Sequence, residues 1–129
     1  MICSSDGFIF GIFADKSWKP SAGVWCKSDK AFLFSLKSPS NEVGIPNIFI
    51  KQNMCYIAMG HESSCGPIFG CGNDICIVRD ANNNRHSNSN LGRTYELPPG
   101  QTNTFLVGSN NFKVSEIEVL QIILLRFMI

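Results

Sequence analysis

The chain has 129 residues and a net charge of +1, and 44% of its residues are apolar. This length suits one domain with one core, and the apolar share excludes a globally disordered chain. The near balance of 11 basic and 10 acidic residues, without a basic run, argues against a nucleic-acid-binding surface.

Neither end of the chain carries a recognisable targeting segment or membrane span. The apolar run Phe8–Ala14 is short and contains glycine, and the apolar C-terminal run Ile122–Ile129 is also too short to cross a bilayer. The sequence has no Asn-x-Ser/Thr glycosylation sequon. We therefore expect an intracellular, cytoplasmic location and no membrane-spanning segment.

Short apolar runs separated by turn residues recur along the chain. Gly7–Ala14 has the β-branched and aromatic content of a strand buried on both faces, and Ala31–Leu36 alternates apolar residues on one face. No long helical period is found. Further strands are expected at Ile48–Ile50, Cys55–Met59, Asp74–Val78, Thr104–Gly108 and Glu116–Ile122. The pattern predicts a mainly β fold, a two-sheet antiparallel β-sandwich with short helices in the connections.

Polar and turn-forming segments separate these runs. Asp15–Gly23 and Lys37–Pro46 contain proline and glycine and read as loops, and Asn110-Asn111 reads as a turn. Arg79–Asn90 is the most polar segment and is expected to be an exposed loop. Trp18 in the first loop is expected to cap the core from outside, with exposed contact to a partner as the alternative.

A glycine-rich corner, Gly66–Asn73, precedes the Asp74–Val78 strand. Gly66-Pro67 and Gly70–Asn73 have the chemistry of tight turns around Phe69. Asp74 is expected to cap the turn that begins its strand. The corner precedes a strand rather than a helix, so it is a poor phosphate-binding loop.

The sequence contains none of the usual catalytic motifs. There is no Gly-x-Ser-x-Gly elbow, no P-loop and no dinucleotide-binding glycine set. His61 lies four residues before Cys65, and a Cys–His pair using His61 or His86 is only a minor alternative. We therefore predict a protein without enzymatic activity, cofactor or metal.

The six cysteines could be free thiols, disulfide-bonded pairs or ligands of a metal ion. No Cys-x-x-Cys pair occurs, and no secretory signal supports an oxidising compartment, so reduced and partly buried thiols are favoured. Cys65, Cys71 and Cys76 lie close together in the sequence, which keeps a thiol-dependent antioxidant activity open as an alternative.

Two acidic residues, Glu116 and Glu118, share one face of the last expected strand, with Ile117 and Val119 on the other. Two carboxylates on one face repel each other if buried together, so they face water or meet cationic groups. Glu116 is the first candidate for a hydrogen bond to the glycine-rich corner or to a partner, and Asp74 is the second.

An ordered series of short motifs resembles the TLDc domain, which occurs in the oxidation-resistance proteins and their relatives. The resemblance covers the chain from about Gly7 to Ile122. The motifs are Trp18, Phe32–Leu36, Gly66–Gly70, Asp74-Ile75, Ser89–Gly92 with Tyr95, Phe105–Ser109, and Phe112 with Ser115–Val119.

The resemblance implies a β-sandwich with flanking helices and no established catalytic centre. It also implies a link to oxidative-stress protection and binding to the vacuolar proton-pumping ATPase. The residues matching the family signature, and therefore candidates for partner contact or structure, are Glu116, Glu118, Asp74, Gly66, Pro67, Phe69, Gly70 and Trp18. A structural C-terminal module of a larger signalling protein is a further alternative.

Two departures from the family pattern concern the ends of the chain. Domains of this family begin with helices and at least one strand before the position of Ile9, so residues 1–122 are expected to be a TLDc domain that lacks its N-terminal part. Residues 123–129 are expected to form an apolar extension. A missing strand would leave a sheet edge and part of the core open to water.

Overall fold

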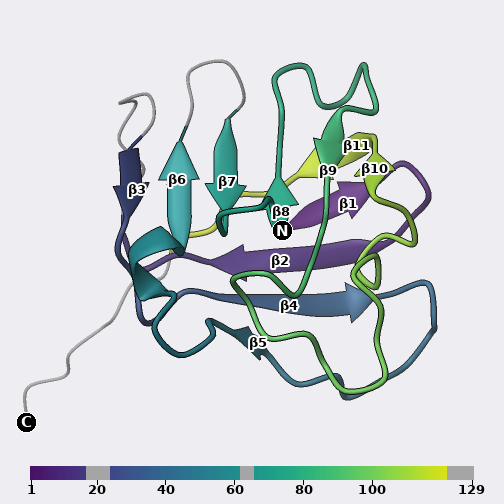
Figure 1. The fold of residues 1–129 in the computed structure, drawn as a ribbon. Helices are drawn as coiled ribbons and strands as arrows, with labels where there is room; N and C mark the ends of the chain where they lie inside the picture. The colour runs from purple at the N-terminus through teal and green to yellow at the C-terminus, as the bar shows by residue number, and fades with distance from the viewer. Residues whose placement is uncertain (17–23, 62–65, 122–129) are drawn as a thin grey trace, which may run out of the picture.

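The computed structural model describes residues 1–16, 24–61 and 66–121, and strands form nearly all of its regular structure (Figure 1). The strands are short, and a single three-residue 3₁₀ turn, η1, interrupts them in the described parts of the chain. The elements are β1 (Ile2–Ser4), β2 (Ile9–Phe13), β3 (Val24–Cys26), β4 (Phe32–Lys37), β5 (Ile48–Phe49), η1 (Cys55–Ile57), β6 (Met59–His61), β7 (Pro67–Phe69), β8 (Ile75–Cys76), β9 (Ser87–Asn88), β10 (Asn111–Phe112) and β11 (Val114–Ile117).

The strands form two antiparallel sheets. One sheet has the order β11-β1-β2-β4-β5, and the other has the order β10-β9-β8-β7-β6-β3. Figure 1 shows the strands of the six-stranded sheet running across those of the five-stranded sheet. The predicted fold class, mainly β with two antiparallel sheets, is confirmed.

One hydrophobic cluster joins the two sheets. The ring of Phe10 on β2 meets the ring of Phe112 on β10 edge to face, with centroids 5.8 Å apart. Leu33 on β4 and Phe69 on β7 are also buried in this cluster. Burial of such side chains stabilises each by about 1.5–3 kcal/mol relative to exposure, so the pairing of the sheets depends on this shared core.

The two strands read most clearly from the sequence are β2 and β4, which pair along their length. Phe13 stacks on Phe32 with centroids 5.0 Å apart, and the ring of Phe34 lies over Gly11 on the neighbouring strand. Glycine at this position leaves room for the ring, since any Cβ there would overlap it. The aromatic and β-branched content that predicted these strands therefore also packs them together.

Two predicted strands are wrong. Cys55–Ile57 is a 3₁₀ turn, and the strand begins only at Met59 and runs to His61. Thr104–Gly108 is a turn in which the N–H of Gly108 donates to the carbonyl of Thr104, at 2.7 Å. Its apolar residues, including Leu106, are buried in the core without joining a sheet, which a strand-like composition does not distinguish.

Other boundaries also differ from the prediction. The strand expected over Asp74–Val78 is limited to Ile75–Cys76, and the last strand is Val114–Ile117 rather than Glu116–Ile122. The expected helices in the connections amount to η1 alone among the described residues.

Several strands lie where the sequence predicts turns or loops. Pro67–Phe69 forms β7 in the middle of the six-stranded sheet, although its proline and flanking glycines predict a turn. Ser87–Asn88 in the polar loop and Asn111–Phe112 at the predicted turn form β9 and β10. β1 and β3 were not predicted. Each of these strands spans only two or three residues, too few to show a periodicity.

Among the residues that the structure describes, no helix has the length and apolar character needed to cross a membrane.

A substitution at Gly66 tests how tightly the glycine-rich corner packs before β7. Its φ is +147°, and a Cβ there would come within 2.5 Å of the carbonyl oxygen of Ile77. Gly66→Ala is therefore expected to lower the free energy of unfolding by roughly 2–3 kcal/mol through backbone strain and this clash. Chemical denaturation measures the change.

Gly100→Ala is the matched control, because Gly100 also has a positive φ, +78°, but has open space around its Cβ position. Gly100→Ala is therefore expected to lower the free energy of unfolding by about 1 kcal/mol, through backbone strain alone. Equal losses in the two variants would show that the contact with Ile77 does not matter.

Candidate functional site

A buried carboxylate, that of Asp74, lies at the start of β8 and accepts four backbone N–H groups. Its Oδ2 accepts from Gly92, Arg93 and Tyr95 at 3.0–3.1 Å. The N–H of Thr94 lies 3.0 Å from Oδ1 and 3.2 Å from Oδ2. Asp74 has no exposed surface. Asp74 and residues 92–95 are referred to below as the Asp74 cluster.

The turn between β7 and β8 places this carboxylate. Gly70, Gly72 and Asn73 all have positive φ, and the N–H of Asn73 donates to the carbonyl of Gly70 at 3.1 Å. A Cβ on Gly70 would overlap the carboxylate of Asp74 and would come within 2.9 Å of Cβ of Thr94. The glycine thus supplies both the backbone conformation and the space that the buried carboxylate needs.

The Asp74 cluster connects distant parts of the chain. The hydroxyl of Tyr95 donates to the carbonyl of Ala58 at 2.8 Å, just before β6. The carbonyl of Thr94 accepts from the N–H of Lys51 at 2.8 Å, and Tyr95 forms a bridge with Ile50 next to β5. The segment held by Asp74 is therefore bonded to residues that adjoin strands of both sheets.

The electrostatics of the cluster favour a structural role. Burial raises the pKa of Asp74 above its ordinary value, while the four N–H donors act in the opposite direction. Burial, together with the charge of Asp74, raises the pKa of Tyr95. A carboxylate with no exposed surface, held by four backbone donors, is not positioned to exchange a proton with a substrate.

The structure brings together some of the predicted site residues. Gly66, Pro67, Phe69 and Gly70 lie on or beside β7, one turn from Asp74; Phe69 and Gly70 are buried, whereas Pro67 is exposed. The sequence predicts that Asp74 caps its own turn, whereas in the described structure its carboxylate accepts from the N–H groups of residues 92–95.

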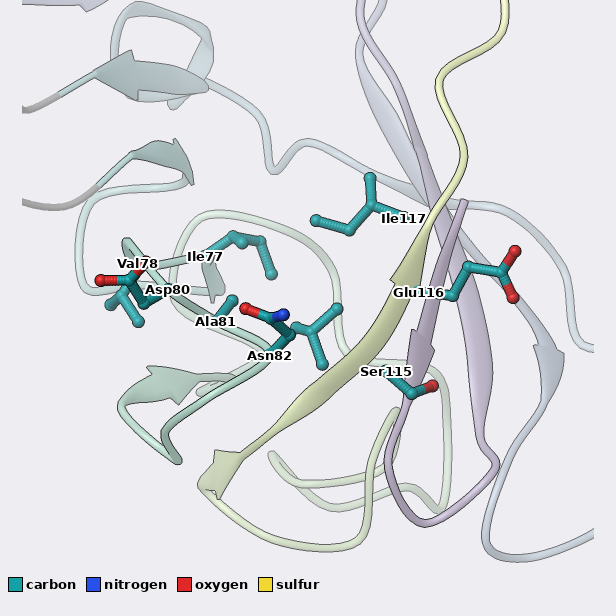
Figure 2. A pocket seen from close by; sticks show the side chains of 9 residues that line it. Ile77, Val78, Asp80, Ala81, Asn82, Ser115, Glu116 and Ile117 are labelled. Atoms are coloured by element: carbon teal, nitrogen blue, oxygen red, sulfur yellow. The ribbon is translucent and has the colours of Figure 1, made fainter.

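Glu116 and Glu118 lie elsewhere. Glu116 is on β11 and Glu118 follows it, and both are exposed. Figure 2 shows the side chain of Glu116 pointing away from the segment 77–82. In the described part of the chain no hydrogen bond joins Glu116 to the glycine-rich corner. Trp18 lies outside the described residues.

A surface groove of about 440 Å³ runs between β11 and the segment that follows β8. Ile77, Ala81 and Val114 contribute apolar surface to it, and Asp80 and Glu116 also line it. The side chain of Ile117 points toward this segment in Figure 2.

Among the described residues, the cysteines and histidines form no catalytic pair. Cys3, Cys26, Cys55, Cys71 and Cys76 are free cysteines; Cys71 is exposed and Cys76 is buried. Cys65 lies outside the described residues, as does the side chain of His61. Within the described ranges no group of three His, Cys, Asp or Glu side chains is placed to hold a metal ion.

Sequence reasoning missed residues 92–95 as the partners of Asp74. Four consecutive backbone N–H groups carry no side-chain signature, so composition cannot show them. The one available signal was the motif Ser89–Gly92 with Tyr95, which is separated from Asp74 by the polar segment. The hydroxyl of Ser89 donates to the carbonyl of Asp74 at 3.1 Å, which brings this motif to the start of β8.

These features define a β-sandwich-like domain with a buried polar cluster and a groove on its surface. The family model of the TLDc domain matches residues 1–123. The chain therefore belongs to the TLDc domain family, as the ordered motifs of the sequence predicted. Neither the search of curated proteins nor the search of solved structures found a match.

Asp74→Asn tests the buried carboxylate. An amide retains one acceptor oxygen but directs its own N–H groups at backbone donors, so the variant is expected to lose about 3 kcal/mol of unfolding free energy. Chemical denaturation again gives the value. Asp29→Asn makes the same change at an exposed position and should stay within about 0.5 kcal/mol of the parent; a similarly small loss for Asp74→Asn would contradict the role assigned to the cluster.

Tyr95 predicts a dependence of stability on alkaline pH. The unfolded chain releases the phenol proton near its ordinary pKa of 10.0, whereas burial raises the pKa of Tyr95 in the folded protein. Above that pH the unfolded state binds fewer protons than the folded state, so the free energy of unfolding falls as pH rises. The limiting slope from this one group is about 1.4 kcal/mol per pH unit.

Tyr95→Phe removes this contribution and should flatten the alkaline fall, although it also loses the bond to Ala58 at every pH. Denaturation at a series of alkaline pH values measures the slope. Tyr56→Phe, at the exposed second tyrosine, is the control. An unchanged slope in Tyr95→Phe would exclude Tyr95 as its source.

Proposed function

We propose that the chain is a non-enzymatic TLDc module that acts through protein–protein contact. The observation that carries the proposal is the family match over residues 1–123. The geometry supports it in two ways: the buried carboxylate of Asp74 is occupied by backbone donors, and exposed residues of β11 lie beside a groove.

The specific role that we propose is cytoplasmic: binding to the vacuolar proton-pumping ATPase, support of oxidative-stress protection, or both. This role comes from what TLDc domains do as a family. Glu116 and Glu118 are the proposed contact residues, because both are exposed and Glu116 points away from the rest of the groove lining. The glycine-rich corner and Asp74 hold the fold that presents them.

Affinity capture from a cell lysate tests the role. The tagged chain is the bait, a cooperative thermal transition is confirmed first, and subunits of the proton pump are detected by immunoblotting. The expected result is retention of pump subunits by the parent chain and by Asp29→Asn, and their loss with Asp74→Asn because that bait is destabilised. A folded parent chain that retains no pump subunit would contradict the binding role.

A thiol-dependent antioxidant activity is the second candidate, and the exposed Cys71 is the observation that favours it. Replacing Cys65, Cys71 and Cys76 together with Ser separates the two functions. Under the proposed function, protection of cells against peroxide survives in the folded triple variant. Loss of protection with the fold and pump binding intact would support the thiol activity instead.

A further inference from the structure

β11 is an edge strand, and the pattern of its hydrogen bonds shows which backbone groups face outward. Glu118 and Met1 exchange two bonds: the N–H of Glu118 donates to the carbonyl of Met1 at 2.8 Å, and the N-terminal ammonium donates to the carbonyl of Glu118 at 2.6 Å. Bonded and non-bonded pairs alternate in antiparallel strands. Ile117, opposite Ile2, is therefore in a non-bonded pair, and its N–H and C=O point away from β1.

The groove lies along this outward side of β11. Within the groove lining, the N–H of Val114 on β11 already donates outward to the carbonyl of Ala81 at 2.9 Å. Beyond that bond no described residue bonds to the outward N–H or C=O of Ile117, and 51% of the surface of Ile117 is exposed. The groove, of about 440 Å³, is open to solvent along this edge.

The charges along the edge have one sign. Asp80 and Glu116 are the ionisable residues that line the groove, and neither lysine, arginine nor histidine lines it in the described structure. The alternation of the strand puts Glu118 on the same side as Glu116, opposite to Ile117. An added strand would thus meet the carboxylates of Glu116 and Glu118 on one face of β11 and the side chain of Ile117 on the other.

We propose that the open edge of β11 binds an extended peptide segment whose residues alternate between basic and apolar. The peptide adds a strand to the five-stranded sheet through the N–H and C=O of Ile117. Its basic residues lie beside Glu116 and Glu118, and its apolar residues lie beside Ile117 in the groove. The inference rests on the proposed role as an interaction module and names the surface and partner chemistry.

A second copy of the chain fits this edge less well. If two β11 strands paired antiparallel about Ile117, Glu116 of each copy would lie opposite Glu118 of the other. Like charges directly opposite each other in adjacent strands are destabilising. The charge pattern of the edge therefore favours a basic partner over self-association.

The probe is a short fluorescent peptide of alternating lysine and valine, and its binding is followed by fluorescence anisotropy. Two matched peptides serve as controls: one replaces lysine with glutamate, and the other keeps the side chains but carries N-methyl groups that prevent strand pairing. Only the first peptide is expected to bind. Hydrogen exchange gives a second readout, because binding should protect the N–H of Ile117, whereas that of Glu116, paired with Cys3 on β1, is already protected.

Two variants of the protein separate the contribution of backbone pairing to peptide binding from that of charge. Ile117→Pro removes an N–H that faces outward, so it costs no bond to β1 and should leave the thermal transition unchanged while abolishing binding. Glu116→Lys with Glu118→Lys should weaken the lysine peptide roughly tenfold and allow the glutamate peptide to bind. Glu96→Lys, a charge reversal at an exposed residue away from β11, is the control and should bind the lysine peptide as the parent does.

The proposal is overturned if the lysine peptide does not bind, if the N-methylated peptide binds equally well, or if Ile117→Pro binds unchanged. It is also overturned if the edge is covered by a second copy, which would appear as concentration-dependent protection of Ile117 without peptide. Pump capture by the Ile117→Pro bait distinguishes the two proposals: if capture persists while peptide binding is absent in every form, the inference fails and the proposed function stands.

Discussion

The fold depends on how the backbone holds one buried carboxylate, that of Asp74. Removing Asp74 from water is costly, and four consecutive backbone N–H groups offset part of that cost. Because these donors belong to a segment that also bonds to residues near β5 and β6, the charge connects parts of the chain that the short strands alone would hold weakly. Gly70 beside it is then required both for its positive φ and for the space that the carboxylate occupies.

The sequence predicted the parts of the fold in which side-chain chemistry repeats. The predicted ends of β2, β4 and β5 agree with the observed ends to within one or two residues, because their apolar and aromatic runs are long enough to show strand character. Strands of two or three residues, such as Ser87–Asn88, are set by pairing with neighbours that are distant in the sequence. The opposite error occurs at Thr104–Gly108, where the sequence predicts a strand. Its apolar residues are buried in the core but form a turn. In the candidate site, Asp74 was selected from the sequence, but its donors belong to the main chain and were not.

The residues that match the family signature divide into two groups in space. The glycine-rich corner and Asp74 are mostly interior, whereas Glu116 and Glu118 are on the surface beside the groove. A change in the first group is expected to act through folding, and a change in the second through contact. The distinction separates loss of binding caused by instability from loss of binding caused by a missing contact. It also explains why a buried acidic residue and exposed acidic residues can belong to the same set of motifs.

The pairing of β1 with β11 has a consequence for how the protein is made. The bonds between Met1 and Glu118 join residues 117 positions apart, so β1 can pair with β11 only after all the residues between them have been synthesised. Closing so long a loop is slow in comparison with forming a local hairpin. During translation one edge of β1 therefore stays unpaired in the nascent chain, where it is available to chaperones and to other unfinished chains. Yield in cells should thus depend on the last few residues of the sheet more than their small buried area suggests.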